Sequence, residues 1–363
     1  MGLLRYLLAS LVLASHLGHT VLDGINPGVA AVVVFYMLAG HVVAGLWQKW
    51  HQQPGALAHF YADRLWRILP QYYAAAAVAA LLWWAGAQSP FLSAQPSALH
   101  WLAQLSVVPL SYYMYTGGDH FVLLPPAWSL GVELQFYALA PFLVLLRLRW
   151  LALAMAASLA VFVAAQLQWL HTDHFGYRLL PGVLFLFLTG AWLRRCTAST
   201  CAPLLLLWGA MLVYLLWLWG APPAISHQPY RRDVALGLVL GLPVLALLQV
   251  ARQRWAGRLG RLPGLAHLAR LDAALASASY GVFLWHFPVL WALPWLVLSP
   301  LLPPLPPGSS AQLLWVCLLT TACALAAHVA IERPAWRMWR ARHRQRLPVK
   351  PPKPVAQGFL GGK

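Results

Sequence analysis

Acidic residues are scarce in this chain of 363 residues, and so are charged residues in general. Only 8 Asp and Glu accompany 25 Lys and Arg, and charged residues make up 9% of the sequence, while 61% is hydrophobic. Water-soluble domains carry about 25% charged residues, and disordered chains are poor in apolar ones. The composition therefore excludes disorder and argues against a soluble protein. A net charge of +17 would suggest a nucleic-acid partner, and proteins that bind one gather their basic residues on one polar face. The positions of the basic residues, given below, argue against that partner.

Cysteine is equally scarce, with four residues in the chain. Cys196 and Cys201 form a C-x4-C pair, and Cys317 and Cys323 lie in an apolar run near the end. No His stands at a spacing typical of zinc sites beside either pair. We therefore expect no metal site, and interpret these four as ordinary small residues.

Long apolar runs dominate the sequence. A helix needs about 20 mostly apolar residues to cross a bilayer, and lipid offers no partners to exposed backbone groups, which favours helices. The run 203–219 does not alternate between apolar and polar residues, as a membrane β-barrel strand would. We predict an all-α, polytopic membrane protein with about ten transmembrane helices. The predicted spans are residues 3–22, 28–47, 68–87, 127–146, 151–170, 178–193, 203–220, 234–250, 278–299 and 311–331.

The basic residues predict the orientation of these helices. We place both termini in the cytoplasm, and only Arg178, Arg231 and Arg232 then fall outside, as the positive-inside rule requires. The segment 96–113 is apolar enough to be a further span. A crossing there would turn most later basic residues outward, so we predict a re-entrant or interfacial segment near 96–113 instead.

We assign residues 1–335 to one membrane domain that contacts the lipid bilayer. Residues 336–363 are basic and then rich in Pro, which predicts a flexible cytoplasmic tail. The stretch 251–277 carries several Arg among apolar residues and is typical of an amphipathic helix on anionic lipid.

Ionisable side chains within the predicted spans are candidate functional residues, because they are costly in lipid. Glu133 is the one acid that lies well inside a span. We interpret His41 and His328 first as partners in helix–helix hydrogen bonds, and His19 as an interfacial residue. His16 and His286 then remain as the histidines with the strongest functional interpretation.

Arg5 and His16 lie on the same face of the first span. They are eleven residues apart, which is about 16 Å along a helix and close to three full turns. By depth, His16, Glu133 and His286 could share the middle layer of the bilayer core. A long anionic co-substrate could therefore bind near Arg5 and reach His16, since His is the usual general base near neutral pH.

Arg64 and Arg67 precede a predicted span and are three residues apart. On a helix they face the same way, and paired guanidinium groups can bind a phosphate. The alternative interpretation is an ordinary pair of positive-inside anchors.

Several short segments, in this order, resemble the acyltransferase-3 family of bacterial integral membrane proteins. Arg5 and His16 match its R-x10-H pattern, and Arg64 and Arg67 match its R-x-x-R-I-x-P turn. The further matching segments are 35–40 (FYMLAG), 128–137 (WSLGVELQFY), 279–286 (SYGVFLWH) and 332–334 (ERP). Ala39 and Phe283 stand where the family has Ser and often Tyr.

The resemblance implies an enzyme of the bacterial inner membrane, in the stand-alone form without a fused esterase domain. It would move an acyl group, usually acetyl, from cytoplasmic acyl-CoA to a hydroxyl of a cell-surface or lipid-linked carbohydrate. Acyl-CoA is then a co-substrate, and no bound cofactor is expected. The alternative is a transporter or flippase for a lipid-linked glycan, which would transfer no acyl group.

The resemblance also implies roles for individual residues. His16 would act as the general base, and Glu133 would orient a histidine or a sugar hydroxyl. Arg5, Arg64 and Arg67 would bind acyl-CoA. The residues expected to line the substrate cavity are Trp128, Tyr137, Ser279, Tyr280 and His286. The acceptor glycan, and the choice between direct transfer and an acyl-enzyme, stay open.

Overall fold

The computed structural model describes residues 1–255, 265–298 and 305–343. These residues form helices, turns and two isolated β-bridges, without a strand. The long helices are α1 (Gly2–His16), α2 (Pro27–Trp50), α3 (Ala56–Trp84), α6 (Ala127–Leu143), α7 (Leu148–Gln166), α8 (Leu180–Arg195), α9 (Ala202–Gly220), α11 (Arg231–Trp255), α12 (Leu265–Leu298), α13 (Ser310–Ala327) and α14 (Arg333–His343). The prediction of an all-α fold is confirmed.

The predicted spans each overlap one of these helices, and the protein is a multi-pass membrane protein. Among the described residues, 8 helices are long and apolar enough to cross a membrane. Helix α1, with 15 residues, and α6, with 17, are shorter. The predicted number of spans and the cytoplasmic position of the termini therefore stay predictions.

Helix α1 ends earlier than the predicted span 3–22. It stops at His16, because Gly18 adopts a left-handed backbone conformation (φ 83°) and the chain then turns back through an antiparallel bridge between Val21 and Ile25. Glycine reaches this conformation at little cost. His16 is therefore the last residue of a short helix rather than a residue in the middle of a long one.

The segment predicted to be re-entrant or interfacial forms three short helices. They are α4 (Ala98–Ser106), η1 (Val108–Tyr112) and α5 (Tyr113–Thr116). Val107, with φ 65°, breaks the helix, and α4 is only nine residues long. The side chain of Gln104 donates to the carbonyl of Phe121, and η1 packs on α6. The segment is therefore not a further straight span.

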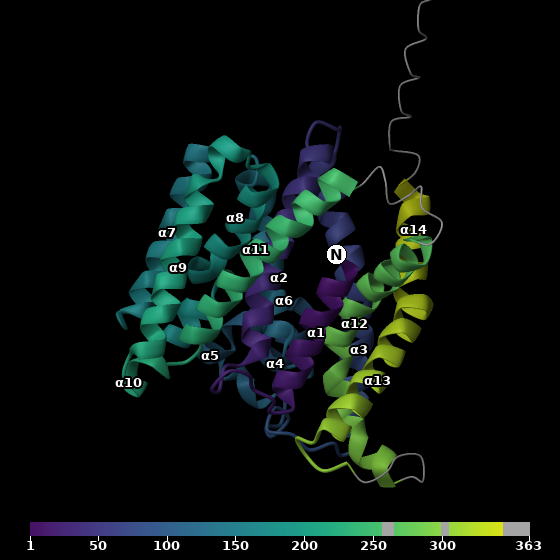
Figure 1. The fold of residues 1–363 in the computed structure, drawn as a ribbon. Helices are drawn as coiled ribbons and strands as arrows, with labels where there is room; N and C mark the ends of the chain where they lie inside the picture. Colours follow the sequence, from purple (N-terminus) through teal and green to yellow (C-terminus); the bar gives the residue numbers. More distant parts are fainter. Residues whose placement is uncertain (256–264, 299–304, 344–363) are drawn as a thin grey trace, which may run out of the picture.

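Helix α1 lies in the middle of the bundle (Figure 1). It packs against α2 on one side and α12 on the other, while α2 packs against α8 and α11, and α12 packs against α13 and α3. Figure 1 shows α7, α8 and α9 on the far side of α2 from α12, α13 and α14, while α11 runs across α2. The central position of α1 places both Arg5 and His16 between the two groups of helices.

Helices α2 and α8 approach each other closely because both present glycine at the contact. A Cβ on Gly40 would collide with the carbonyl of Phe187, and one on Gly190 would collide with the carbonyl of Met37. Small residues allow such backbone contact, which drives helix association in lipid. This contact fixes α2, and α2 forms one wall of the site described below.

Two predictions about segments expected to be cytoplasmic concern residues at the edge of what the structure describes. In the stretch 251–277, residues 251–255 extend α11 and residues 265–277 begin α12, and residues 256–264 lie outside the described part. Of the predicted tail 336–363, residues 336–343 belong to α14, and Trp339 is buried there. Residues 344–363 lie outside the described part.

Candidate active site

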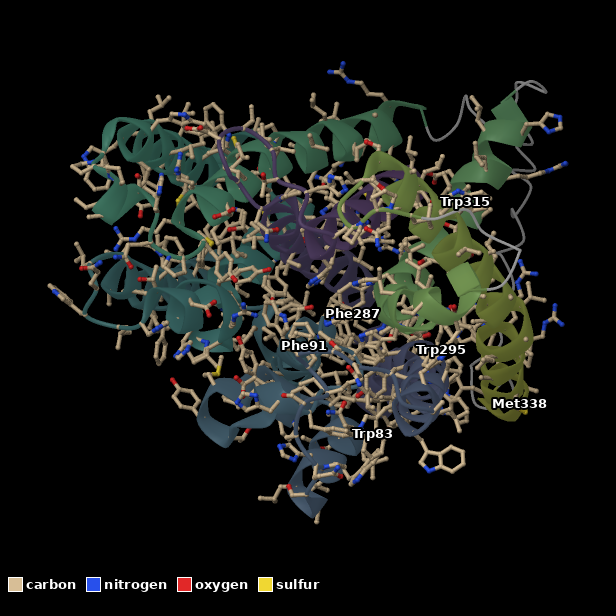
Figure 2. All side chains as sticks on the ribbon, turned by 90° about the horizontal axis from the view of Figure 1, so that it is seen from below. Trp83, Phe91, Phe287, Trp295, Trp315 and Met338 are labelled. Atoms are coloured by element: carbon tan, nitrogen blue, oxygen red, sulfur yellow. The ribbon has the colours of Figure 1, made fainter. Side chains whose placement is uncertain are left out.

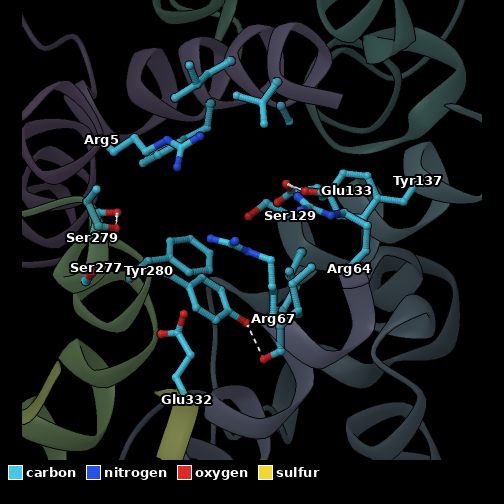
Figure 3. Close-up of a pocket in the computed structure, with 18 of the residues that line it drawn as sticks. Arg5, Arg64, Arg67, Ser129, Glu133, Tyr137, Ser277, Ser279, Tyr280 and Glu332 are labelled. Atoms are coloured by element: carbon cyan, nitrogen blue, oxygen red, sulfur yellow. Dashed lines mark hydrogen bonds between the residues drawn. The ribbon is translucent and has the colours of Figure 1, made fainter. Parts of the chain in front are cut away.

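The first part of α3, where the sequence predicted a turn, forms helix, and it meets α1 at a cavity of about 590 Å³. Arg5 of α1 and Arg64 and Arg67 of α3 line it, and we call it the arginine cavity. Figure 3 shows the three side chains extending into one space from different directions. The other predicted site residues that line this cavity are Glu133, Tyr137, Ser279 and Tyr280.

The three arginines differ in their charge partners. Arg64 is buried, and both its Nε, at 3.1 Å, and its Nη2 donate to Oδ2 of Asp63. Arg5 and Arg67 have no carboxylate within ion-pair distance in the described part of the chain. The guanidinium of Arg67 instead lies 5.8 Å from the ring of Trp336. Arg5 and Arg67 therefore leave positive charge for an anionic ligand.

Glu133 belongs to this arginine cavity and not to a histidine pair. Its carboxylate accepts a hydrogen bond from the hydroxyl of Tyr137, one helical turn further along α6. The ring of Tyr137 lies 5.9 Å from the guanidinium of Arg64. Glu133 therefore faces the arginines from α6, and a depth shared with His16 and His286 stays a prediction.

The hydroxyl groups contributed by α12 already have partners. Tyr280 donates to the carbonyl of Ile68 at 3.0 Å and so links α12 to α3. Ser279 donates to the carbonyl of Ala276 within its own helix at 2.9 Å. Both side chains shape the wall of the arginine cavity.

A second, smaller cavity of about 80 Å³ lies at the end of α1, and we call it the histidine cavity. His16, Trp128 and Arg178 are among the residues that line it. Val32 and Phe283 line both cavities, together with Ser129. The cavities therefore adjoin at these three side chains, and α1 connects them by presenting Arg5 to one and His16 to the other.

His286 lines neither of these two cavities, and its predicted place in the substrate cavity stays a prediction. It is fully buried and stacks on the ring of His16, with 5.3 Å between ring centroids. Its Nδ1 lies 3.0 Å from the carbonyl of Val282. Phe283, three residues earlier on α12, faces the cavities, and a step of three residues rotates His286 about 60° away from that face.

The ring of Phe287 packs edge-on against His16 at 4.9 Å. Figure 2 shows Phe91, from the loop after α3, next to Phe287, and their ring centroids are 5.6 Å apart. The rings of His286 and Phe287 thus both pack against the ring of His16, and the ring of Phe91 packs against that of Phe287.

Sequence reasoning named His328 as a hydrogen-bond partner and 332–334 as a family segment, but it did not place these residues in the site. The Nε of Arg333 donates to Nε2 of His328 at 3.0 Å, and Nδ1 of His328 lies 2.8 Å from Oε2 of Glu332. Because arginine only donates, Nε2 accepts and Nδ1 carries the proton that is donated to Glu332. All three residues line the arginine cavity. The H-x3-E-R spacing before Pro334 was the signal available in the sequence.

Within residues 1–255, 265–298 and 305–343, no three His, Cys, Asp or Glu side chains lie close enough together to hold a metal ion. The four cysteines are unpaired. The ligand-binding groups of the site are therefore guanidinium, carboxylate, imidazole and hydroxyl groups.

The fold and the two adjoining cavities define a multi-pass membrane protein with a site inside its helix bundle. Residues 1–329 match the family described as an acyltransferase domain, the acyltransferase-3 family, over nearly the whole chain. The chain belongs to this family, and the protein is a membrane acyltransferase.

Two relatives were found. The chain is 26% identical over 334 residues to the exopolysaccharide production protein ExoZ of Rhizobium meliloti (strain 1021), covering 87% of this chain and 92% of the relative. It is 35% identical over 176 residues to an uncharacterized protein of Aquifex aeolicus (strain VF5), covering 47% of this chain and 72% of that protein. No solved structure matches.

Proposed function

We propose that the protein transfers an acyl group, acetyl in the first instance, from cytoplasmic acyl-CoA to a hydroxyl of a surface or lipid-linked polysaccharide. The observation that carries the proposal is the junction of the two cavities at Val32, Ser129 and Phe283. A donor bound in the arginine cavity can present its thioester at this junction, within reach of His16. In this arrangement the arginine cavity faces the cytoplasm of a bacterial inner membrane.

The arginine cavity supplies the donor site. Among the described residues, Arg5 and Arg67 form no ion pair with a carboxylate, and phosphates are suitable ligands for their guanidinium groups. Arg5 and His16 are about 16 Å apart along α1. That separation suits acyl-CoA, which carries its phosphates and its thioester at opposite ends of a long arm. Glu133 and Tyr137 are then positioning residues on the donor side.

The histidine cavity supplies the base. The neutral imidazole of His16 accepts the proton of the acceptor hydroxyl while that oxygen attacks the thioester carbonyl. The tetrahedral intermediate collapses, the C–S bond breaks, and the coenzyme A thiolate takes the proton back from His16. Holding donor and acceptor on either side of one junction supplies the proximity that this step needs.

The name of the Rhizobium relative supports a polysaccharide as the acceptor, because that protein is described by exopolysaccharide production and matches along most of both chains. A transporter that moves a glycan without acyl transfer is not favoured, because the chain belongs to an acyltransferase family.

The test uses the full-length protein in native membranes with acetyl-CoA labelled in its acetyl group. We expect label in extractable polysaccharide with the wild type and at least a 100-fold lower rate with His16→Ala. His19→Ala is the matched control, because His19 follows α1 and lines neither cavity. Normal transfer by a folded His16→Ala variant would remove His16 as the base, and no labelled glycan with the wild type would contradict the proposed function.

A further inference from the structure

Of the described Arg, Lys, Asp and Glu residues, Arg178 alone lines the histidine cavity. It lies at the end of the short helix η3 (His174–Arg178), just before α8. Its Nε donates to Oδ1 of Asp173 at 2.6 Å, and its Nη2 donates to the hydroxyl of Tyr230 at 3.2 Å. Only 13% of the Arg178 side chain is exposed. The guanidinium is thus held in a defined position next to the cavity that contains His16.

Four aromatic rings surround this guanidinium. Their centroids lie 4.6 to 5.4 Å from it, within the range of cation–π attraction. The rings are those of Tyr113, Trp128, Tyr177 and Tyr230. We call these four residues and Arg178 the Arg178 cluster. Burial raises the pKa of the Tyr113 phenol to about 12, so this ring is uncharged at neutral pH.

The Arg178 cluster and the base share one cavity. Trp128, Tyr177 and Tyr230 line the histidine cavity beside Arg178 and His16. A ligand in this cavity therefore contacts aromatic faces, a guanidinium and the imidazole at once. The cavity thus combines aromatic faces with fixed polar groups, and such groups set the orientation of a bound small molecule.

We propose that the Arg178 cluster is the acceptor subsite and that it selects an uncharged sugar ring. The apolar face of the ring would pack on Trp128 and Tyr177, and Arg178 would donate to ring hydroxyls. One of those hydroxyls would then lie at His16. This inference rests on the proposed function, because it takes the acyl-accepting group to be a carbohydrate hydroxyl.

The preference for an uncharged ring follows from Asp173. Its carboxylate already neutralises Arg178 at 2.6 Å, and 19% of the Asp173 side chain is exposed. Asp173 does not itself line the cavity, but a sugar carboxylate beside Arg178 would meet a guanidinium whose charge is already balanced, and it would bring a second negative charge near that of Asp173. A hydroxylated, uncharged ring accepts hydrogen bonds from Arg178 without that cost.

The first experiment locates the acyl group. Membranes that contain the wild-type protein would receive labelled acetyl-CoA and polysaccharide extracted from cells that lack the protein, with its existing esters removed by mild base. The product would be cleaved to oligosaccharides and sequenced by mass spectrometry. Label on a neutral sugar unit is expected. Label on a uronic acid or another anionic unit would overturn the assigned preference.

The second experiment tests the residues. We expect Arg178→Gln to raise the KM for the extracted polysaccharide at least tenfold and to leave the KM for acetyl-CoA unchanged. Arg232→Gln is the matched control, since Arg232 also lies beside an aspartate and a Trp ring but lines neither cavity. An unchanged polysaccharide KM in Arg178→Gln would overturn the inference while the proposed function stands.

Further variants guard against a folding defect. Arg178→Gln leaves Asp173 without its partner, so the double variant with Asp173→Asn removes both charges. Tyr230→Phe removes one hydroxyl and should raise the polysaccharide KM severalfold. We expect coenzyme A to stabilise the wild type against heat and to stabilise each variant equally. For an anionic acceptor, Asp173→Asn alone would lower the polysaccharide KM, which would contradict the proposal. For an uncharged acceptor, Asp173→Asn should raise the polysaccharide KM, because the guanidinium of Arg178 loses the carboxylate that holds it in position.

Discussion

The imidazole rings of His16 and His286 stack with their centroids 5.3 Å apart and their planes 25° from parallel. His16 is the last residue of α1, so no further helical turn holds its side chain. His286, on α12, is fully buried and cannot move aside without opening the bundle. The stack therefore supplies the support that the end of a helix lacks. His286 acts through His16 and is a positioning residue.

This relationship predicts different outcomes for two variants of His286. His286→Phe retains a flat ring beneath His16, so we expect transfer within about fivefold of the wild-type rate. His286→Ala removes the ring and leaves a void, for which a cost of about 3 kcal/mol or more in stability is typical of large-to-small changes. We expect kcat to fall about 100-fold with the KM for acetyl-CoA unchanged. Equal loss in both variants would show that an imidazole nitrogen of His286 is needed instead.

The donor site predicts a second pair of results. Arg5→Gln and Arg67→Gln remove guanidinium groups without a carboxylate partner, so each should raise the KM for acetyl-CoA about tenfold or more without loss of folded protein. Arg64→Gln should also reduce the yield of folded protein, because it leaves Asp63 buried without its partner. The double variant of Arg64→Gln with Asp63→Asn should restore the yield of folded protein, but its KM for acetyl-CoA should stay raised. Binding of coenzyme A by calorimetry checks each variant, and unchanged affinity in Arg5→Gln would contradict the donor site.

Much of the arginine cavity could be predicted from sequence because its residues lie in local patterns. The three-residue spacing of Arg64 and Arg67 places both on one helix face, and Glu133 stood out as an acid inside an apolar run. These residues do line one cavity. The same reasoning overestimated the length of α1, since the effect of Gly18 on the helix end depends on the turn that follows.

The histidine cavity could not be predicted in the same way. The rings around Arg178 come from α5, α6, η3 and the residue before α11, segments far apart in the sequence. No spacing within one segment records that they meet. The rotation of α12 about its axis also depends on packing against α1, and the pattern of the segment does not record it. This rotation turns Phe283 toward the cavities and stacks His286 on His16.

The junction between the cavities predicts the size of the acyl group. Phe283 is the largest of the three side chains that line both cavities, and it stands between the arginines and His16. Phe283→Ala should widen the junction and raise kcat/KM for butyryl-CoA relative to acetyl-CoA about tenfold. Phe35→Ala is a suitable control, since Phe35 lines only the arginine cavity. Unchanged relative rates for the two donors in Phe283→Ala would show that acyl size is set elsewhere.

The set formed by His328, Glu332 and Arg333 predicts an effect on the donor site. His328→Ala removes the acceptor of Arg333 and frees the carboxylate of Glu332. We expect a severalfold higher KM for acetyl-CoA and an unchanged KM for the polysaccharide. His328→Gln can accept from Arg333 through its amide oxygen and should recover part of the loss. A change confined to the polysaccharide KM would instead place this set on the acceptor side.

The contact between α2 and α8 predicts a stability difference between two glycines. In Gly40→Ala the added methyl group would collide with the carbonyl of Phe187, which is backbone and cannot turn away. Overpacking of this kind costs about 1–3 kcal/mol, so we expect a lower melting temperature in detergent and less monodisperse protein. Gly209→Ala on α9 is the control, because nothing lies within 4 Å of its added Cβ. Its melting temperature should stay level or rise, since alanine favours the helix over glycine by about 1 kcal/mol. Equal behaviour of the two variants would mean that α2 and α8 can separate without loss of the fold.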